Sequence, residues 1–252
     1  MACHDSAPVG HTRRPMGSRR REGSIINRRG LAALAGLSAL IAGCGYTGPS
    51  AATLLQRAKT TFDQTSAFHI QLTSQDTAGT GIELTAAEGD AVRPDGFTGT
   101  LTVEEAGFPL QIKVISAGGK FYVQLPFSDD FQTASPSKYG FGDPGRLLDP
   151  NTGISTLLTS AQQPSIGSSV RLNGESLQQV DATLPGNLIA SLLVDDDPSK
   201  PVSAVFSIDT ASYQVREVDL TGPIFEAGHQ STFHLVLDNY GENVSVSPPP
   251  TP

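Results

Sequence analysis

The feature that most constrains the fold is a two-residue alternation of apolar and polar side chains, repeated along most of the chain. Side chains alternate between the two faces of a β-strand, so each such run predicts a strand with one apolar face. The clearest runs, and the strands expected after them, lie at residues 68–73, 97–103, 110–114, 121–125, 166–172, 176–184, 202–208, 213–220 and 231–238. Gly118-Gly119 and Asn173-Gly174 separate neighbouring runs and predict hairpin turns. The fold class expected is α+β, with a mostly antiparallel sheet.

Helical periodicity is confined to three segments. Ser50 is a suitable N-cap for a helix over residues 51–65, in which Leu54, Leu55, Ala58 and Phe62 form one apolar stripe. Shorter helices are predicted at 153–161 and 187–194.

The ratio of strands to helices poses a packing problem. Nine or ten strands with an apolar face must bury it against something, and three helices of about 30 residues in total are few for that area. One solution is a sheet curled around a ligand cavity. The other is a closed barrel or sandwich whose interior is filled by side chains. Periodicity alone does not separate the two.

The first 43 residues have the composition of an export signal. Arginines precede an uncharged apolar run at 31–42, which is too short to span a bilayer. Residues 40–44 (LIAGC) resemble the bacterial lipobox, which implies diacylation of Cys44 and cleavage before it; the alternative is a buried free cysteine. Met16 begins a more ordinary leader than Met1, and Arg28-Arg29 leaves twin-arginine export open beside the general route. Residues 1–43 are therefore predicted to be a lipoprotein signal peptide.

Charge divides the chain at Cys44. Seven arginines and two acidic residues precede it, whereas 10 basic and 23 acidic residues make up the rest, a net charge of −13. Nucleic-acid binding requires neutralisation of phosphates. A domain this acidic is therefore expected to bind no nucleic acid. With Cys3 in the leader, the exported chain keeps a single cysteine and must be stabilised by its core. The expected organisation is a tether at 44–50, one domain at 51–247 and a disordered tail at 248–252.

Several motifs carry a resemblance to a family. They are SAFHI at 66–70, GKFYV at 119–123, DP at 143–144 followed by LLDPNTGI at 147–154, LNG at 172–174 and DNYGENVSV at 238–246. Together with the lipobox they resemble the actinobacterial LppX/LprG-type lipoproteins, the LppX/LprAFG family. LLDPNTGI is the most specific of them, whereas Tyr240 and Phe206 depart from the family by standing where it often has tryptophan. The chain resembles a divergent member.

The resemblance implies a curled half-barrel with a few short helices on its concave side and an apolar cavity between them. It implies a non-enzymatic carrier of acylated lipids or lipoglycans between envelope layers, anchored in the inner membrane through Cys44 on the extracytoplasmic side. A lipid transporter in that membrane is a further expected partner. Ordinary core packing is the alternative role for the predicted cavity residues, which are Leu101, Val103, Leu110, Ile112, Val114, Phe121, Val123, Leu157, Leu158, Leu188, Ile189 and Leu192.

Motifs for catalysis are weak. No G-x-S-x-G elbow occurs, and Cys44 is assigned to lipidation. His229 and His234 are five apart, a poor spacing for one face of a helix or strand, and residues 195–197 (DDD) are more typical of a solvated loop than of a calcium site. We therefore predict no enzyme activity, metal or cofactor. A scaffold that acts through protein partners and a hydrolase of envelope lipids are the competing hypotheses.

Overall fold

The computed structural model describes residues 46–250, apart from 78–81, 106, 140, 193–197 and 225–227. The predicted signal peptide and Cys44 lie outside the described residues. Thr47–Pro252 form one compact unit, and every residue of the hydrophobic core belongs to it. Among the described residues, no helix combines the length and apolar character needed to cross a bilayer.

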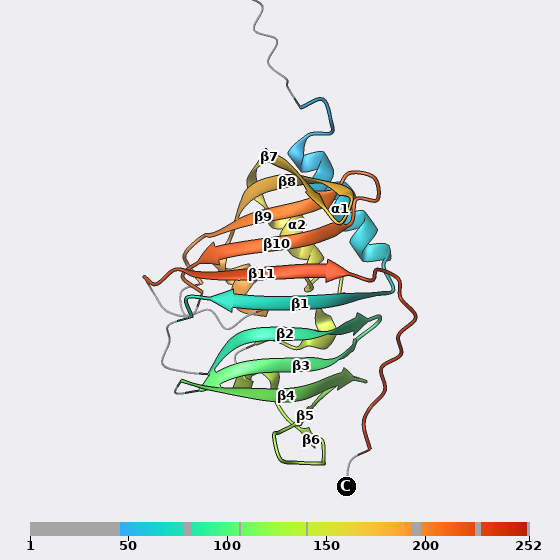
Figure 1. Ribbon diagram of the computed structural model, residues 1–252, viewed down its shortest axis with the longest axis vertical. Coiled ribbons are helices and arrows are strands. Elements are labelled where there is room, and N and C mark those ends of the chain that lie inside the picture. The colour runs from blue at the N-terminus through green and yellow to red at the C-terminus, as the bar shows by residue number, and fades with distance from the viewer. Residues whose placement is uncertain are drawn as a thin grey trace, which may run out of the picture. The chain divides into compact units, whose positions relative to one another are not determined.

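A single antiparallel sheet of 11 strands dominates the unit (Figure 1). Its strands are β1 (Ala67–Gln75), β2 (Ile82–Val92), β3 (Gly96–Glu105), β4 (Phe108–Ala117), β5 (Lys120–Gln124), β6 (Gln132–Thr133), β7 (Gln162–Leu172), β8 (Glu175–Leu184), β9 (Val202–Asp209), β10 (Val215–Gly222) and β11 (Ser231–Asp238). The helices are α1 (Ala51–Gln64), α2 (Ser155–Ser160), α3 (Gly186–Leu192) and the 3-10 turns η1 (Pro136–Tyr139) and η2 (Pro144–Arg146).

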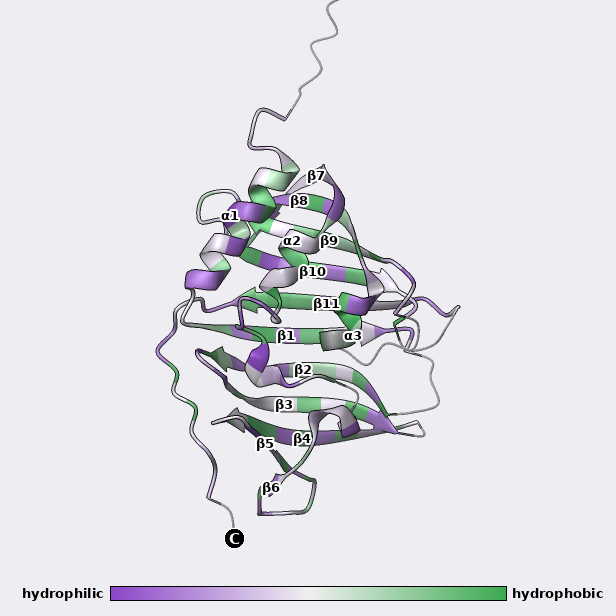
Figure 2. Cartoon of the chain, turned by 180° about the vertical axis from the view of Figure 1, so that it is seen from behind, coloured by the Kyte–Doolittle hydropathy of each residue, from purple (hydrophilic) through white to green (hydrophobic). Residues whose placement is uncertain are grey.

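Strand order along the sheet is β6-β5-β4-β3-β2-β1-β11-β10-β9-β8-β7. Pairing of β1 with β11, with Leu72 opposite Leu235, joins the N-terminal strands to the C-terminal ones. Seen from behind, the helices lie on one face of the curled sheet (Figure 2), which we call the concave face. The predicted curled, mostly antiparallel sheet with few helices is confirmed.

Strand β2 was missed by the sequence analysis. A bulge between Leu84 and Ala86 interrupts its alternation, and beyond the bulge its concave face carries only Ala87, Gly89 and Ala91. Small residues are needed there: a Cβ on Gly89 would lie 2.7 Å from the ring of Phe97 on the neighbouring strand. The large apolar side chains on this part of the concave face therefore come from the neighbouring strands, and β2 itself shows no alternation of large apolar and polar residues.

The edge strand β7 is irregular. It begins at Gln162, four residues before the predicted start, includes Pro164, and its pairing with β8 shifts register twice, between Gln162 and Ser165 and between Ile166 and Ser169. Proline and bulges are typical of edge strands. One side of an edge strand has no neighbour, so a missing N–H or an unpaired residue is tolerated there and hinders pairing with another chain.

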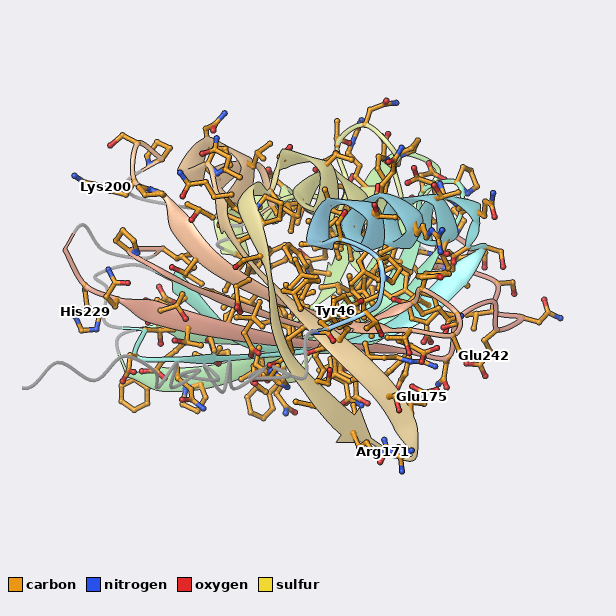
Figure 3. All side chains as sticks on the ribbon, turned by 90° about the horizontal axis from the view of Figure 1, so that it is seen from above. Tyr46, Arg171, Glu175, Lys200, His229 and Glu242 are labelled. Atoms are coloured by element: carbon orange, nitrogen blue, oxygen red, sulfur yellow. The ribbon has the colours of Figure 1, made fainter. Side chains whose placement is uncertain are left out.

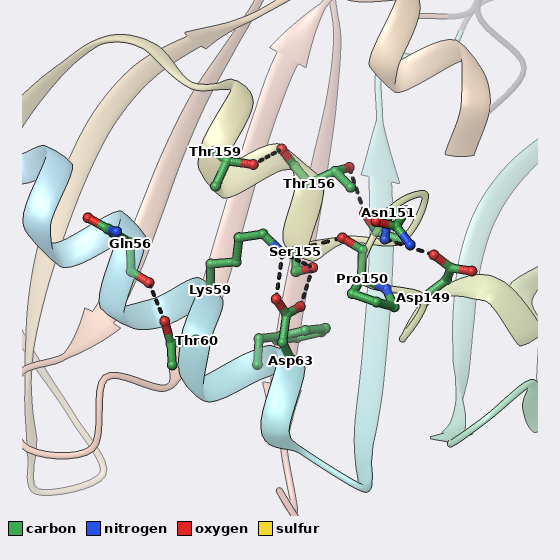
Figure 4. Close-up of polar contacts among 12 residues, drawn as sticks. Gln56, Lys59, Thr60, Asp63, Asp149, Pro150, Asn151, Ser155, Thr156 and Thr159 are labelled. Atoms are coloured by element: carbon green, nitrogen blue, oxygen red, sulfur yellow. Dashed lines mark hydrogen bonds and ion pairs between the residues drawn. The ribbon is translucent and has the colours of Figure 1, made fainter.

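Helix α1 packs its predicted apolar stripe on the sheet and holds α2 through polar contacts. Ser50 caps α1 by accepting a hydrogen bond from the Thr53 amide at 3.3 Å. The Asp63 carboxylate accepts hydrogen bonds from the Lys59 ammonium at 2.5 Å and from the Ser155 hydroxyl at 2.7 Å, so this one carboxylate links the two helices (Figure 4).

The sheet has two different ends. We call the closed end the one at which β1 begins and β11 ends, and the open end the opposite one. In Figure 3, Arg171, Glu175 and Glu242 mark the closed end, and Lys200 and His229 the open end.

Aromatic packing fills the closed end. The Phe62 ring lies 5.1 Å from Phe68 and 6.2 Å from Tyr240, measured between centroids. Arg93 donates to the carbonyls of Thr65 at 2.7 Å and Leu148 at 2.5 Å, which ties the α1 terminus and the η2 segment to the sheet. The chain after β11 then runs past the strand ends (Figure 1).

Candidate functional site

An apolar cavity of about 150 Å³ lies between the concave face and the segments that cover it. The sheet contributes one wall through β1, β2, β3, β10 and β11, and η2, α2 and α3 with their flanking residues contribute the other. Its lining residues are Ile70, Leu72, Leu84, Ala87, Phe97, Leu101, Phe141, Gly142, Asp143, Pro144, Arg146, Leu147, Thr152, Ile154, Leu157, Ile189, Leu192, Leu220 and Leu235.

Strand register builds the sheet wall. Leu72 pairs with Ala87 on one side and with Leu235 on the other, and Ala87 pairs with Leu101. Paired residues point to the same face, so these side chains form one row across four strands. The small Ala87 in the middle of the row leaves the space that the cavity occupies.

A tight turn at residues 149–153 builds the opposite wall. The Asp149 carboxylate accepts hydrogen bonds from the amides of Asn151 at 2.8 Å and Thr152 at 3.1 Å, and the Asn151 amide is the main reason why the pKa of Asp149 lies below its ordinary value. A Cβ on Gly153 would lie 2.3 Å from the Leu147 carbonyl oxygen, so only glycine fits. The turn thereby places Leu147 and Ile154 against the cavity, which gives the LLDPNTGI motif a structural role.

The cavity has a small polar margin made by Asp143, Arg146 and Thr152. Asp143 is held in place: it accepts from the Ser116 hydroxyl at 2.7 Å and from the Gly145 amide at 3.0 Å. The Arg146 side chain is exposed, and within the described part of the chain it makes no hydrogen bond or ion pair. The margin thus offers an exposed positive charge beside an apolar interior, and this charge also helps to lower the pKa of Asp149.

Four of the predicted cavity residues line this space: Leu101, Leu157, Ile189 and Leu192. The others do not. Val103, Ile112, Val114, Phe121, Val123 and Leu158 are buried in the surrounding core, Leu188 is half-buried against it, and Leu110 is 39% exposed at the open end. Their contact with a ligand stays a prediction.

Other lining residues were missed. Ile70, Leu72, Leu220 and Leu235 belong to strands that the alternation had predicted, so the pattern placed them on the apolar face without showing which part of that face is left uncovered. Leu84 and Ala87 lie on the missed strand β2, and no periodic signal pointed to them.

A second hollow of about 400 Å³ lies at the closed end, between the β7–β8 turn and the ends of β10 and β11. Its lining is largely polar, and two of its charged side chains pair with each other: Arg216 donates to both carboxylate oxygens of Glu175 at 2.6 and 2.7 Å. The third charged side chain, Asp238, has a buried Oδ1 without a hydrogen-bond partner among the described residues, and a lining of this kind does not suit an acyl chain. The smaller apolar cavity is therefore the better candidate site.

Within the described residues, no histidine lines the cavity. His69 contacts Asp90 and His234 contacts Asp219, each at 2.7 Å, from strand positions that alternate with the concave ones. Over the described stretches, no group of three or more His, Cys, Asp or Glu side chains is placed to hold a metal ion.

The sequence and the fold of this chain are both similar to those of known mycobacterial lipoproteins. The lipoarabinomannan carrier protein LprG of Mycobacterium tuberculosis is 22% identical over 231 residues, which cover 87% of this chain and 94% of that protein. The crystal structure of LprF from Mycobacterium bovis superposes with a TM-score of 0.65 at 16% identity, covering 81% of this chain and 99% of LprF. Mycobacterium tuberculosis LppX gives a TM-score of 0.56, also at 16% identity, covering 78% and 97%.

These structures share the curled antiparallel sheet of this chain. The model of the LppX_LprAFG lipoprotein family matches residues 50–246, which span the helix α1, all 11 strands and the cavity walls. The chain therefore belongs to the LppX_LprAFG lipoprotein family.

Proposed function

We propose that the protein binds acylated lipid or lipoglycan in its apolar cavity and carries it between layers of the cell envelope. The observation that carries this proposal is a cavity whose walls are almost wholly aliphatic or aromatic, with charge only at its margin. Acyl chains would leave water for the cavity while a polar head group stays beside Arg146. The name of the relative LprG, a lipoarabinomannan carrier, supports a lipoglycan ligand.

The volume of the cavity sets a condition on this function. Pockets that hold drug-sized ligands measure roughly 300–1,000 Å³, whereas this one measures about 150 Å³. Burial of about five methylenes at ~0.8 kcal/mol each gives about 4 kcal/mol, which corresponds to millimolar binding. A carrier must bury more of the chain than that, so the cavity has to widen when ligand enters.

The wall beside α3 is the part best suited to move. A backbone hydrogen bond, from the Gly142 amide to the Leu192 carbonyl at 3.0 Å, joins α3 to the segment that leads into η2. Ile189 and Leu192 of α3 line the cavity from this side. Outward displacement of α3 would lengthen the cavity without breaking any strand pairing.

Attachment to the membrane completes the proposal. Residues 1–43 would direct export and be removed, and diacylglyceryl-modified Cys44 would hold the domain, through the tether at 44–50, on the extracytoplasmic face of the inner membrane. Two or more acyl chains give stable anchoring, because each buried methylene contributes about 0.8 kcal/mol. A lipid transporter in the same membrane would supply the cargo, and the domain itself would carry out no catalysis.

Cavity filling tests the binding function. In Ala87→Phe the new ring points into the cavity, and we expect at least a tenfold weaker binding of a fluorescent fatty-acyl probe to delipidated protein, with a thermal midpoint close to that of the wild type. Ala86→Phe is the matched control, since Ala86 pairs with Thr73 and Thr102 on the other face of the same strand.

Two outcomes would contradict the proposal. Delipidated wild-type protein that takes up no probe would favour the scaffold hypothesis instead. Equal binding by the Ala87→Phe and Ala86→Phe proteins would place the ligand elsewhere than in this cavity.

A further inference from the structure

Four large apolar side chains are exposed together at the open end of the sheet. Phe127 is 110% exposed, Phe108 72%, Leu125 40% and Leu110 39%, and we call these four residues the rim patch. Phe108 and Leu110 begin β4, and they alternate in phase with the buried Ile112 on the concave face. Lys113 and Gln124 are the last pair between β4 and β5, so Leu125 and Phe127 leave β5 on the side toward which the first half of β4 extends. The rim patch therefore extends the concave apolar face beyond the core.

The rim patch lies close to the cavity wall. Leu84, which lines the cavity, pairs with Val103 of β3, and Val103 pairs with Leu110 of β4. Val103 is 2% exposed and belongs to the buried core, so a single covered apolar residue separates the rim patch from the cavity wall in this row.

Phe127 is the most exposed residue of the rim patch. It lies in a turn closed by a hydrogen bond from the Ser128 amide to the Leu125 carbonyl at 3.1 Å. Its backbone has a φ of 66°, a conformation that costs free energy for a residue other than glycine. An exposed ring of this kind needs a soft apolar phase to enter, whereas a protein partner would have to present a matching pocket.

We propose that the rim patch inserts into the surface of a lipid bilayer and so holds the domain against the phase from which its ligand would come. This inference rests on the proposed function, because the ligand of the cavity would itself be a membrane lipid. A bilayer is also the apolar phase that a member of a lipoprotein family would meet. Because Glu104 and Glu105 lie close by on β3 and the domain is acidic, insertion relies on apolar burial, and uncharged lipid is the better partner.

The absence of tryptophan from the sequence gives a direct test. In the Thr47–Pro252 unit, which contains the whole core, a Phe127→Trp substitution introduces a single reporter in this turn. On addition of phosphatidylcholine vesicles we expect its emission to shift to shorter wavelength and to be quenched by lipids brominated in the acyl chain. Gln111→Trp, an exposed position on the other face of β4, is the matched control and should show neither change.

Sedimentation with the same vesicles measures the contribution of the rings. Phe108→Asp and Phe127→Asp should each reduce the bound fraction about tenfold or more, since each removes one large apolar side chain from the bilayer. Gln111→Asp adds the same charge to the other face of β4 and should leave binding unchanged. All three positions are exposed, so we expect the variants to fold, and circular dichroism is the control for this.

The acyl-probe assay in solution separates this inference from the proposed function. Normal probe binding by Phe108→Asp and Phe127→Asp, together with lost vesicle binding, would support a docking role for the rim patch. Equal vesicle binding by both Asp variants and Gln111→Asp, or no vesicle binding by the wild-type unit, would overturn it. Failure of the wild-type unit to take up probe would instead remove the carrier function on which the inference rests.

Discussion

The closed and open ends of the half-barrel are built on the same strands but are filled differently. At the closed end Phe68 pairs with Ala91, and Ala91 pairs with Phe97. Four residues along β1, the row Leu72–Ala87–Leu101 repeats this arrangement with leucines in place of the two phenylalanines. The backbone is alike in both rows, so the size of the side chains decides which end is solid and which holds the cavity.

The covering segments reinforce the difference. Phe62 of α1 and Tyr240 after β11 add two more rings to the closed end, and Arg93 fixes three carbonyl groups there. At the open end, where β8 ends, the cover over the cavity comes from the short helix α3. Stability is therefore expected to depend mainly on the closed end, and ligand binding on the open end.

Removal of the central ring of the closed end should have the largest effect. Phe62 is 1% exposed and packs on both Phe68 and Tyr240. Phe62→Ala should lower the free energy of unfolding by about 3–5 kcal/mol, the usual cost of a buried phenylalanine truncation. Urea denaturation measures it. A loss below about 1 kcal/mol would break the assignment of stability to this end.

A matched pair of leucines compares the ends directly. Leu148 and Leu157 are each 2% exposed, but Leu157 lines the cavity and Leu148 does not. Truncation to alanine should cost each protein about 2–5 kcal/mol in the free energy of unfolding. Saturating acyl ligand should restore stability to Leu157→Ala, whose enlarged cavity the ligand fills, and should restore less to Leu148→Ala. Equal recovery would show that the ends are not distinct in this respect.

Acid sensitivity should be a smaller effect, located at the closed end. Burial raises the pKa of the Asp209 carboxyl. Hydrogen bonds from the Ser212 hydroxyl at 2.5 Å and the Ser212 amide at 2.8 Å lower it by more, so the pKa of Asp209 lies below its ordinary value. A carboxyl group with a lowered pKa stabilises the fold above its unfolded-state pKa, and this stabilisation is lost as the pH falls through the folded-state pKa.

The variant Asp209→Asn tests this. It should be less stable than the wild type by about 1 kcal/mol at pH 7, the usual net contribution of a hydrogen bond. The difference should shrink as the pH falls below about 4, because the wild-type carboxyl then gains its proton. Urea midpoints measured between pH 7 and pH 2 provide the readout, and a constant difference over that range would rule out Asp209 as the source.

Much of the fold was predictable because alternation is a local property. The runs at 68–73 and 231–238 became β1 and β11, and Gly118-Gly119 and Asn173-Gly174 form the predicted turns. Strand β2 was not predictable in this way, since Ala87, Gly89 and Ala91 are small to make room for side chains of β3. A small residue that is required by the size of a neighbouring side chain produces no apolar–polar alternation in its own strand.

The site was less predictable than the fold. Alternation assigns Leu101 and Val103 equally to the concave face, but only Leu101 lines the cavity. Which of the two is left uncovered depends on where η2, α2 and α3 come to lie over the sheet, and on the turn held by Asp149 and Gly153. That placement follows from contacts between segments distant in the sequence, which no local pattern records.

The irregular strand β7 has a consequence for encounters between copies of the chain. An open sheet ends in backbone groups that can pair with the edge of another copy. With Pro164 and two register shifts, β7 presents an edge that a second strand cannot follow for more than a few residues. At this edge the sheet can thus stay open without stacking on neighbouring molecules of its own kind.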